Sequence, residues 1–177
     1  MTAPTLCHVS PKDATDTTVG RVTNLINEAY QWSEAELWIK DKERTNTMEI
    51  KSLFENRMII LAYIEDAISG AVKIEEITPE VSGFSMLSAA MENMGRGVGR
   101  ALVAAAERWA RNSGYQKMEI EIVRSDPPND HKSFLQDWYT RLGYVEQSTY
   151  PISLRIPELA PLQRMICVST LYHKRLQ

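Results

Sequence analysis

The chain has 177 residues, of which 44% are hydrophobic and 24% are charged, and its formal net charge is −3. This size and composition are typical of one soluble globular domain, so we expect a single domain over residues 1–177. Scattered basic residues and the lack of an apolar run of about 18 residues argue against nucleic-acid and membrane partners. The N-terminus has no secretory pattern, and two cysteines and three histidines show no ligand spacing. We therefore expect a cytoplasmic protein without a metal, a nuclear location being left open.

Helical periodicity occurs twice in the first third of the chain. Apolar residues recur at helical spacing over residues 17–30, and Thr47 is expected to cap a second helix whose apolar positions run from Ile50 to Met58. Residues 31–47 are polar apart from two tryptophans and show no core pattern. This stretch is therefore predicted to lie outside the core elements.

Three short strands are predicted next. Residues 58–64 form a continuous apolar run, and a second segment begins at residue 67, alternates from Ile68 to Ile74 and ends before Pro79. Residues 82–90 form a third extended segment with small residues at its end. Because only short turns separate these segments, they predict an antiparallel meander.

The second half of the chain mixes helices and strands. A glycine-containing loop leads into a helix from Val98 to about residue 112, followed by a strand at 118–123 and a helix at 132–144. Two further strands are expected, at about 144–148 and 164–172. This order predicts an α/β protein with a mixed sheet rather than a repeated βαβ array.

Gly95, Gly97 and Gly99 stand at alternate positions immediately before the predicted helix. The fingerprint of dinucleotide-binding proteins is G-x-G-x-x-G after the first strand, and its third glycine stands at a different spacing. The phosphate loop of nucleoside-triphosphate-binding proteins requires a Lys followed by Ser or Thr after its last glycine. Neither pattern is present. Bare backbone amides at a helix N-terminus would still bind a pyrophosphate, whereas the alternative is a turn that only starts the helix.

The segment LSAAMENMGRGVGRAL, residues 87–102, resembles the acetyl-CoA-binding signature of the GNAT superfamily of N-acyltransferases. Gly97 and Gly99 occupy the defined glycine positions, and Met94 stands where the family usually has Gln or Arg. Further along, WYTRLGY matches the family's Tyr-x-x-x-Gly-Phe/Tyr segment, with Tyr139 as its tyrosine. Lys132 replaces the Asn that many members have seven residues before this tyrosine.

The resemblance implies a central mixed, mostly antiparallel sheet of about six to seven strands flanked by about four helices, and acetyl-CoA as the acyl donor. The backbone of Leu87 and Ala89 would pair with the pantetheine arm of the donor. The pyrophosphate would bind to a loop and helix start that comprise Met94, Gly95, Arg96, Gly97, Gly99, Arg100 and Ala101. Lys132 would add a contact to a phosphate.

The resemblance also implies roles in the chemistry. Tyr139 would protonate the leaving thiolate, although it also belongs to the apolar stripe of its helix. Glu119 and Glu121 share one face of the strand at 118–123, which indicates either a solvated cleft or an edge strand with an ordinary polar face. Glu121 is the preferred general base or ammonium anchor, and Glu75 and Glu76 are weaker rivals.

Substrate contacts are expected from the region after the first helix and from the acidic strand. The candidates are Tyr30, Trp32, Trp38, Arg44 and Glu119. The resemblance therefore implies an acetyl-CoA-dependent N-acetyltransferase, which we expect to act on a primary amine of a small molecule, as a monomer or homodimer. Two alternatives remain: a peptide or protein amine as acceptor, and a non-catalytic acyl-CoA-binding or scaffold module.

Overall fold

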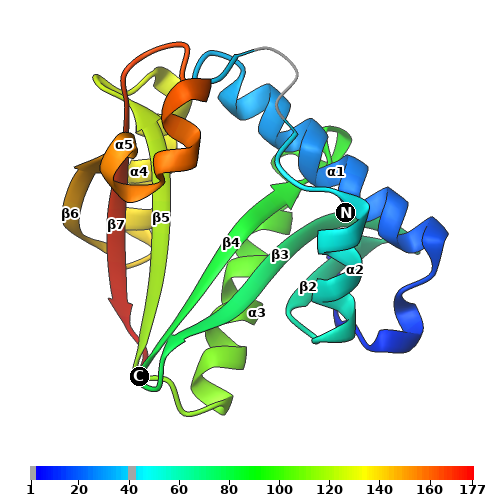
Figure 1. The fold of residues 1–177 in the computed structure, drawn as a ribbon. Helices are drawn as coiled ribbons and strands as arrows, with labels where there is room; N and C mark the ends of the chain where they lie inside the picture. Colours follow the sequence, from blue (N-terminus) through cyan, green and yellow to red (C-terminus); the bar gives the residue numbers. More distant parts are fainter. Residues whose placement is uncertain (1–2, 40–42) are drawn as a thin grey trace.

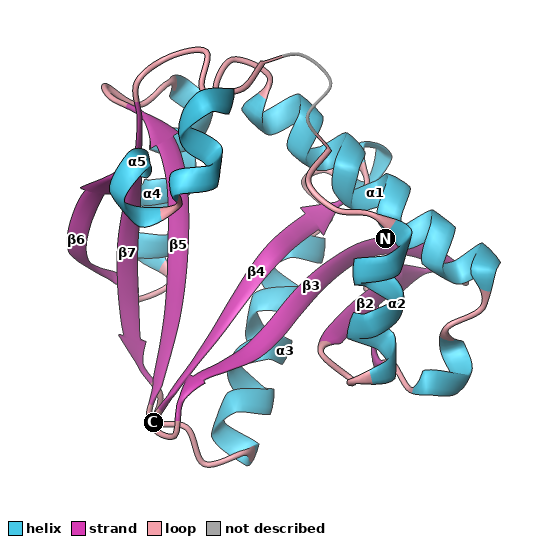
Figure 2. Cartoon of the chain, viewed as in Figure 1, coloured by secondary structure: helices cyan, strands magenta, loops and turns pink. Residues whose placement is uncertain are grey.

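A computed structural model describes residues 3–39 and 43–177. The described chain forms one seven-stranded sheet in the order β1-β2-β3-β4-β5-β7-β6 with helices on both faces, as Figures 1 and 2 show. All neighbouring strands are antiparallel except β4 and β5. The predicted mixed, mostly antiparallel sheet is thus confirmed. The strands are Thr5–His8 (β1), Ile59–Ile64 (β2), Ala67–Thr78 (β3), Val81–Ala89 (β4), Lys117–Ser125 (β5), Val145–Pro151 (β6) and Cys167–Arg175 (β7).

The helices form two layers because their apolar stripes face opposite sides of the sheet. The first two helices pack on one face through Ile26 and Phe54, and the next two pack on the other through Leu102 and Tyr139. A short helical segment follows β6. The bounds are Asp16–Glu34 (α1), Thr47–Glu55 (α2), Val98–Asn112 (α3), Asp130–Arg141 (α4) and Ile152–Arg155 (α5), with 3-10 turns at Pro11–Asp13 (η1), Met91–Asn93 (η2) and Pro157–Leu162 (η3).

The sheet is split in the middle, between its one parallel pair of strands. β4 and β5 pair only from Val81 opposite Lys117 to Gly83 opposite Glu119, whereas β5 and β7 pair over nine positions. Figure 1 shows the two strands close together near the C-terminus and separated at their far ends. The backbone of β4 beyond Gly83 therefore has an edge that β5 does not cover.

A β-bulge in β4 changes the direction of its side chains at the split. The register with β3 shifts between Ala71 and Lys73, which pair with Ser88 and Ser85, and Met86 within the shift has a left-handed φ of 52°. An extra residue on one strand bends it and interrupts the alternation of side chains. As a result Phe84 packs in the α3 layer while Met86 packs in the α1 layer.

The structure corrects the prediction for residues 31–47. Helix α1 continues to Glu34, and Leu37 and Trp38 are buried with Ile152 and Cys167 in a small separate core. Residues 40–42 of this stretch lie outside the described residues. The edge strand β1 was also not predicted, because four residues are too few for a clear alternating pattern. Within the described residues no helix is long and apolar enough to cross a membrane.

Candidate active site

A cavity of about 620 Å³ occupies the split between β4 and β5. Its walls come from the end of α1, the unpaired part of β4, the start of α3, the middle of β5, the first turns of α4, and η3. Most of the lining is apolar, so the few polar side chains stand out as the groups that can orient a ligand. Those that carry a charge or can take up a proton are Glu34, Arg44, Glu121, His131, Lys132 and Glu158.

The N-terminus of α3 presents unbonded amides beside this cavity. The first backbone hydrogen bond of the helix runs from the amide of Ala101 to the carbonyl of Gly97. In the described chain, the four preceding amides, from Gly97 to Arg100, have no backbone acceptor. These amides and the helix dipole favour an anion at this end of α3.

The glycines before α3 have different roles. Gly95 and Gly97 have left-handed φ angles of 76° and 80°, which glycine adopts without strain. A Cβ on Gly99 would lie 3.7 Å from Trp138, which is an ordinary contact, so no protein atom forces a glycine there. Met94 and Gly99 line the cavity, whereas the side chain of Arg96 turns back to Asn93, with a 2.9 Å hydrogen bond.

Tyr139 lies in α4 and lines the cavity from the α3 side of the sheet. It is 7% exposed and packs against Phe84, Trp138 and Tyr144. Burial, and then the nearby Tyr30, raise the pKa of Tyr139 well above its usual range. Its hydroxyl is therefore protonated at neutral pH, which is the form that a proton donor requires.

The two acids of β5 have different surroundings. Glu121 lines the cavity, and its Oε1 accepts hydrogen bonds from Arg155 Nε at 3.0 Å and from Ser169 Oγ. Its Oε2 has no partner among the described residues. Glu119 lies where β4 and β5 are still paired, outside the cavity lining, and contacts His173 Nε2 at 2.7 Å. Because β5 lies between β4 and β7, it is not an edge strand.

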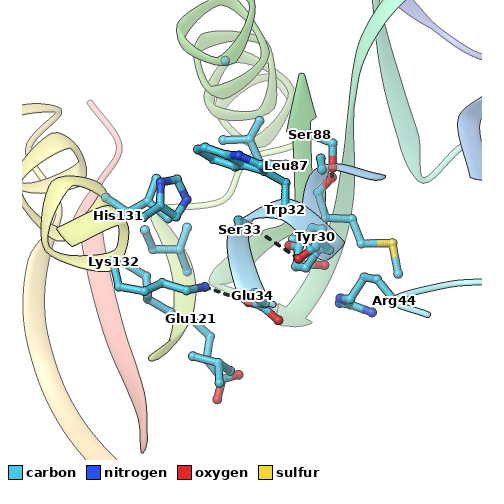
Figure 3. A pocket seen from close by; sticks show the side chains of 18 of the residues that line it. Tyr30, Trp32, Ser33, Glu34, Arg44, Leu87, Ser88, Glu121, His131 and Lys132 are labelled. Atoms are coloured by element: carbon cyan, nitrogen blue, oxygen red, sulfur yellow. Dashed lines mark hydrogen bonds and ion pairs between the residues drawn. The ribbon is translucent and has the colours of Figure 1, made fainter. Parts of the chain in front are cut away.

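A buried ion pair bridges the two sides of the cavity. Lys132 Nζ donates to Glu34 Oε1 at 2.7 Å, and Trp38 Nε1 donates to Glu34 Oε2 at 2.6 Å, as Figure 3 shows for the first pair. The carboxylate lies in the last turn of α1 and the ammonium in the first turn of α4. Each charge has the sign that its helix dipole disfavours, so the attraction between the two side chains must hold them there.

His131 and Trp32 line the cavity next to the Glu34–Lys132 pair. Their rings meet edge to face with centroids 4.9 Å apart, and Trp32 is 51% exposed. Burial, followed by the charge of Lys132, lowers the pKa of His131 below its usual value. At neutral pH the ring is therefore uncharged.

Tyr30, four residues before Glu34 on α1, and Arg44 also line the cavity. The guanidinium carbon of Arg44 lies 5.3 Å from the centroid of the Tyr30 ring. Burial raises the pKa of Tyr30, while Arg44 and the backbone amide of Met86 act in the opposite direction. The Tyr30 oxygen is thus close to both a positive charge and the bulge.

The cavity brings together most, but not all, of the residues that the sequence singled out. Tyr30, Trp32, Trp38, Arg44, Leu87, Ala89, Met94, Gly99, Glu121, Lys132 and Tyr139 line it. Gly95, Arg96, Gly97, Arg100, Ala101 and Glu119 are not part of its lining. Lys132 is at the cavity, but its ammonium is paired with Glu34 rather than free for a phosphate.

Sequence reasoning missed Glu34 and His131. Glu34 was assigned to a polar stretch without a core pattern, and only its position at the end of an extended α1 brings it to the cavity. Phe134 of α4 is 56% exposed and borders the cavity. In the part of the chain that the structure describes, no cluster of three or more His, Cys, Asp or Glu residues could hold a metal ion.

Comparisons with known proteins agree with this geometry. Solved structures with a similar fold include yncA from Salmonella typhimurium with its cofactor acetyl-CoA (TM-score 0.70, 13% identity, 99% of this chain and 95% of that one). Ard1 from Thermoplasma volcanium is also similar, with a TM-score of 0.71 and 16% identity over 99% of both chains. So is an N-acetyltransferase from Staphylococcus aureus Mu50, with a TM-score of 0.70 and 13% identity over 99% of this chain and 100% of that one.

At these identities the solved structures establish the fold alone. None of the curated proteins is similar enough in sequence to count as a relative. The model of the acetyltransferase (GNAT) family, however, matches residues 20–144, which include β4, the glycine loop, α3, β5 and α4. The chain therefore belongs to the acetyltransferase (GNAT) family.

Proposed function

We propose that this protein transfers an acetyl group from acetyl-CoA to a primary amine of a small molecule. The observation that carries the proposal is the split sheet: the free edge of β4 leads to the unbonded amides of α3, and Tyr139 and Glu121 border the cavity between them. The structure of yncA, which has the same fold, was solved with acetyl-CoA. When bound, acetyl-CoA supplies an activated thioester carbonyl for attack by the amine.

The donor side would be held mainly by backbone groups. The amides from Gly97 to Arg100 would bind the pyrophosphate, and Leu87 and Ala89 would offer backbone groups to an extended arm, as an added strand would. The cavity fits this use, because the β4 edge is free along its lining. The side chain of Met94 contributes no polar contact, and a backbone cradle requires none.

Tyr139 is proposed as the proton donor. Its hydroxyl is protonated at neutral pH, it borders the cavity, and no hydrogen bond to another described side chain occupies it. Transfer forms the nitrogen–carbonyl bond and breaks the carbon–sulfur bond, so the leaving sulfur requires one proton. Donation of that proton by a positioned acid typically contributes about 10²- to 10⁴-fold to the rate.

Glu121 is proposed as the group that receives the proton of the amine or anchors its ammonium form. An alkylammonium with a pKa of about 10.4 is mostly charged at pH 7, so its proton must be removed before attack. The Glu34 carboxylate has both oxygens committed, whereas Oε2 of Glu121 has no partner among the described residues. Figure 3 shows the Glu121 carboxylate apart from the Glu34–Lys132 pair.

The proposal is tested by incubating the protein with acetyl-CoA and a panel of small primary amines while measuring free thiol. We expect amine-dependent thiol release that falls at least about 100-fold in Tyr139→Phe. Tyr115→Phe is the matched control, since Tyr115 lies outside the cavity lining and its hydroxyl donates to Glu76 at the surface. It should retain the wild-type rate.

Thermal shift with CoA separates the two parts of the proposal. A ligand at 100 times its dissociation constant stabilises the folded state by about 2.7 kcal/mol. No shift with CoA would contradict the donor site itself. A shift without turnover on any amine would instead indicate a non-catalytic acyl-CoA-binding module, and turnover only on peptides would indicate a peptide acceptor.

A further inference from the structure

We infer that the acceptor carries a carboxylate as well as an amine, and that Arg44 binds this carboxylate. The inference rests on the proposed function, because it assigns the acceptor part of the same cavity. The ligand class is a small amino acid or a similar aminocarboxylate.

Among the residues that the structure describes, Arg44 is a cavity cation for which no acidic partner is found. Lys132 is paired with Glu34, and Arg155, which lies outside the lining, is paired with Oε1 of Glu121. Arg44 is half-buried, and in the described chain it forms no ion pair. A guanidinium offers a planar set of donors that matches a carboxylate with two parallel hydrogen bonds.

The segment that carries Arg44 is fixed before any ligand binds. Asn27 of α1 accepts hydrogen bonds on Oδ1 from the amides of Arg44 and Thr45, both at 2.9 Å. Its Nδ2 donates to the carbonyl of Thr45 at 3.0 Å. The guanidinium carbon lies 5.3 Å from the centroid of the Tyr30 ring, and Figure 3 shows the two side chains near each other. A side chain that is already oriented loses less entropy when it binds a ligand.

The position of Arg44 also fits the acceptor rather than the donor. Arg44 contacts Tyr30, which lies beside the amide of Met86 at the β4 bulge, whereas the unbonded amides for the pyrophosphate lie at the start of α3. Tyr30 is also close enough to Tyr139 to affect its pKa. A carboxylate on Arg44 would therefore place an amine a few bonds away near the proposed proton donor. Glu158, which is exposed and also in the lining, is opposite in charge to Arg44, so it would not bind the carboxylate of the acceptor.

The test compares acceptors in matched pairs: α-, β- and γ-amino acids, each with its own carboxamide, at saturating acetyl-CoA. For the best amino acid, we expect kcat/KM to exceed that of the carboxamide at least about tenfold, the low end for a hydrogen bond to a charged group. Arg44→Gln should remove this preference, and Arg44→Lys should retain part of it. Arg21→Gln, which changes an exposed arginine of α1, should leave the preference unchanged.

Asn27→Ala tests the positioning of Arg44 without removing its charge. It should reduce the ratio of carboxylate to carboxamide kcat/KM, which a general loss of stability would not alter. Equal use of both members of every pair, or an equal loss on both in Arg44→Gln, would overturn the inference. So would weaker CoA binding in Arg44→Gln, because that would place Arg44 at the donor. Dipeptides that outperform free amino acids would assign the carboxylate to a peptide terminus.

A binding measurement keeps the inference testable if no amine is acetylated. Ligand-observed NMR of the same pairs, with CoA present, reports binding without turnover. Binding of the amino acids that is lost in Arg44→Gln would support the carboxylate site while the transferase proposal fails. No binding of any amino acid would overturn the site.

Discussion

The two walls of the cavity are built from different parts of the polypeptide. The wall that we propose for the donor, called the donor wall, consists of the β4 edge and the α3 N-terminus, where backbone amides are the polar groups. The wall that we propose for the acceptor, called the acceptor wall, consists of side chains: the Glu34–Lys132 pair, Arg44 beside Tyr30, and Trp32 against His131. A backbone wall tolerates changes of side chain as long as φ and ψ are kept, whereas a side-chain wall depends on residue identity.

The largest effect is expected from removing one member of the buried pair on the acceptor wall. Lys132→Met leaves Glu34 buried without its cation and should destabilise the fold by about 3 kcal/mol, measured by urea unfolding. The double variant Lys132→Met/Glu34→Gln should recover part of this loss, because no unpaired charge remains. A single variant as stable as wild type would show that the pair does not hold α1 to α4.

The next effect concerns the reaction rather than the fold. Tyr139→Phe should lower kcat at least about 100-fold, while the thermal shift produced by CoA is retained, because the donor wall does not use this hydroxyl. Equal losses of kcat and of CoA binding would contradict the separation of the two walls.

A smaller effect is expected on the donor wall, where conformation matters more than side chain. Gly97→Ala places a Cβ on a residue with φ of 80° and should cost about 1–2 kcal/mol and weaken CoA binding. Gly20→Ala in α1 is the matched control: it has open space and helical backbone, so it should stabilise by about 0.5–1 kcal/mol. Met94→Ala should weaken CoA binding less than Gly97→Ala does. The reverse order would assign the donor contact to the Met94 side chain.

The smallest effect concerns pH. Burial lowers the pKa of His131 below its ordinary 6.5, so the unfolded state binds more protons as the pH falls through 6.5. Stability should therefore decline below about pH 6.5, and His131→Gln should remove part of this decline. The pKa of His8 is also lowered, so His8→Gln is the matched variant. The free energy of unfolding of both variants is measured by chemical unfolding at pH 5.5 and 7.5. An identical pH dependence in wild type and His131→Gln would contradict the prediction.

The elements that carry the donor wall could be predicted from sequence because their signals are local. The strand at 81–89, the alternate glycines and the amphipathic α3 are set by nearest neighbours and by backbone preferences. The meander and the mixed sheet followed from the same patterns and are confirmed. The β4 bulge could not be predicted, because nothing in the segment VSGFSMLSA marks where one strand gains a residue relative to its partner.

The acceptor wall depended on tertiary structure. Glu34 and Lys132 are 98 residues apart, and each lies at the helix end that disfavours its charge, so no local rule pairs them. In the sequence Arg44 is one of several candidates, and only its contacts with Asn27 and Tyr30 in the folded chain distinguish it. By itself, the sequence determined most of the helices and strands, though not β1 or the end of α1, and where backbone amides are left free, since these depend on short-range sterics and hydrogen bonding. Only the folded chain decided which charges meet across the split sheet, because such contacts depend on how distant segments pack.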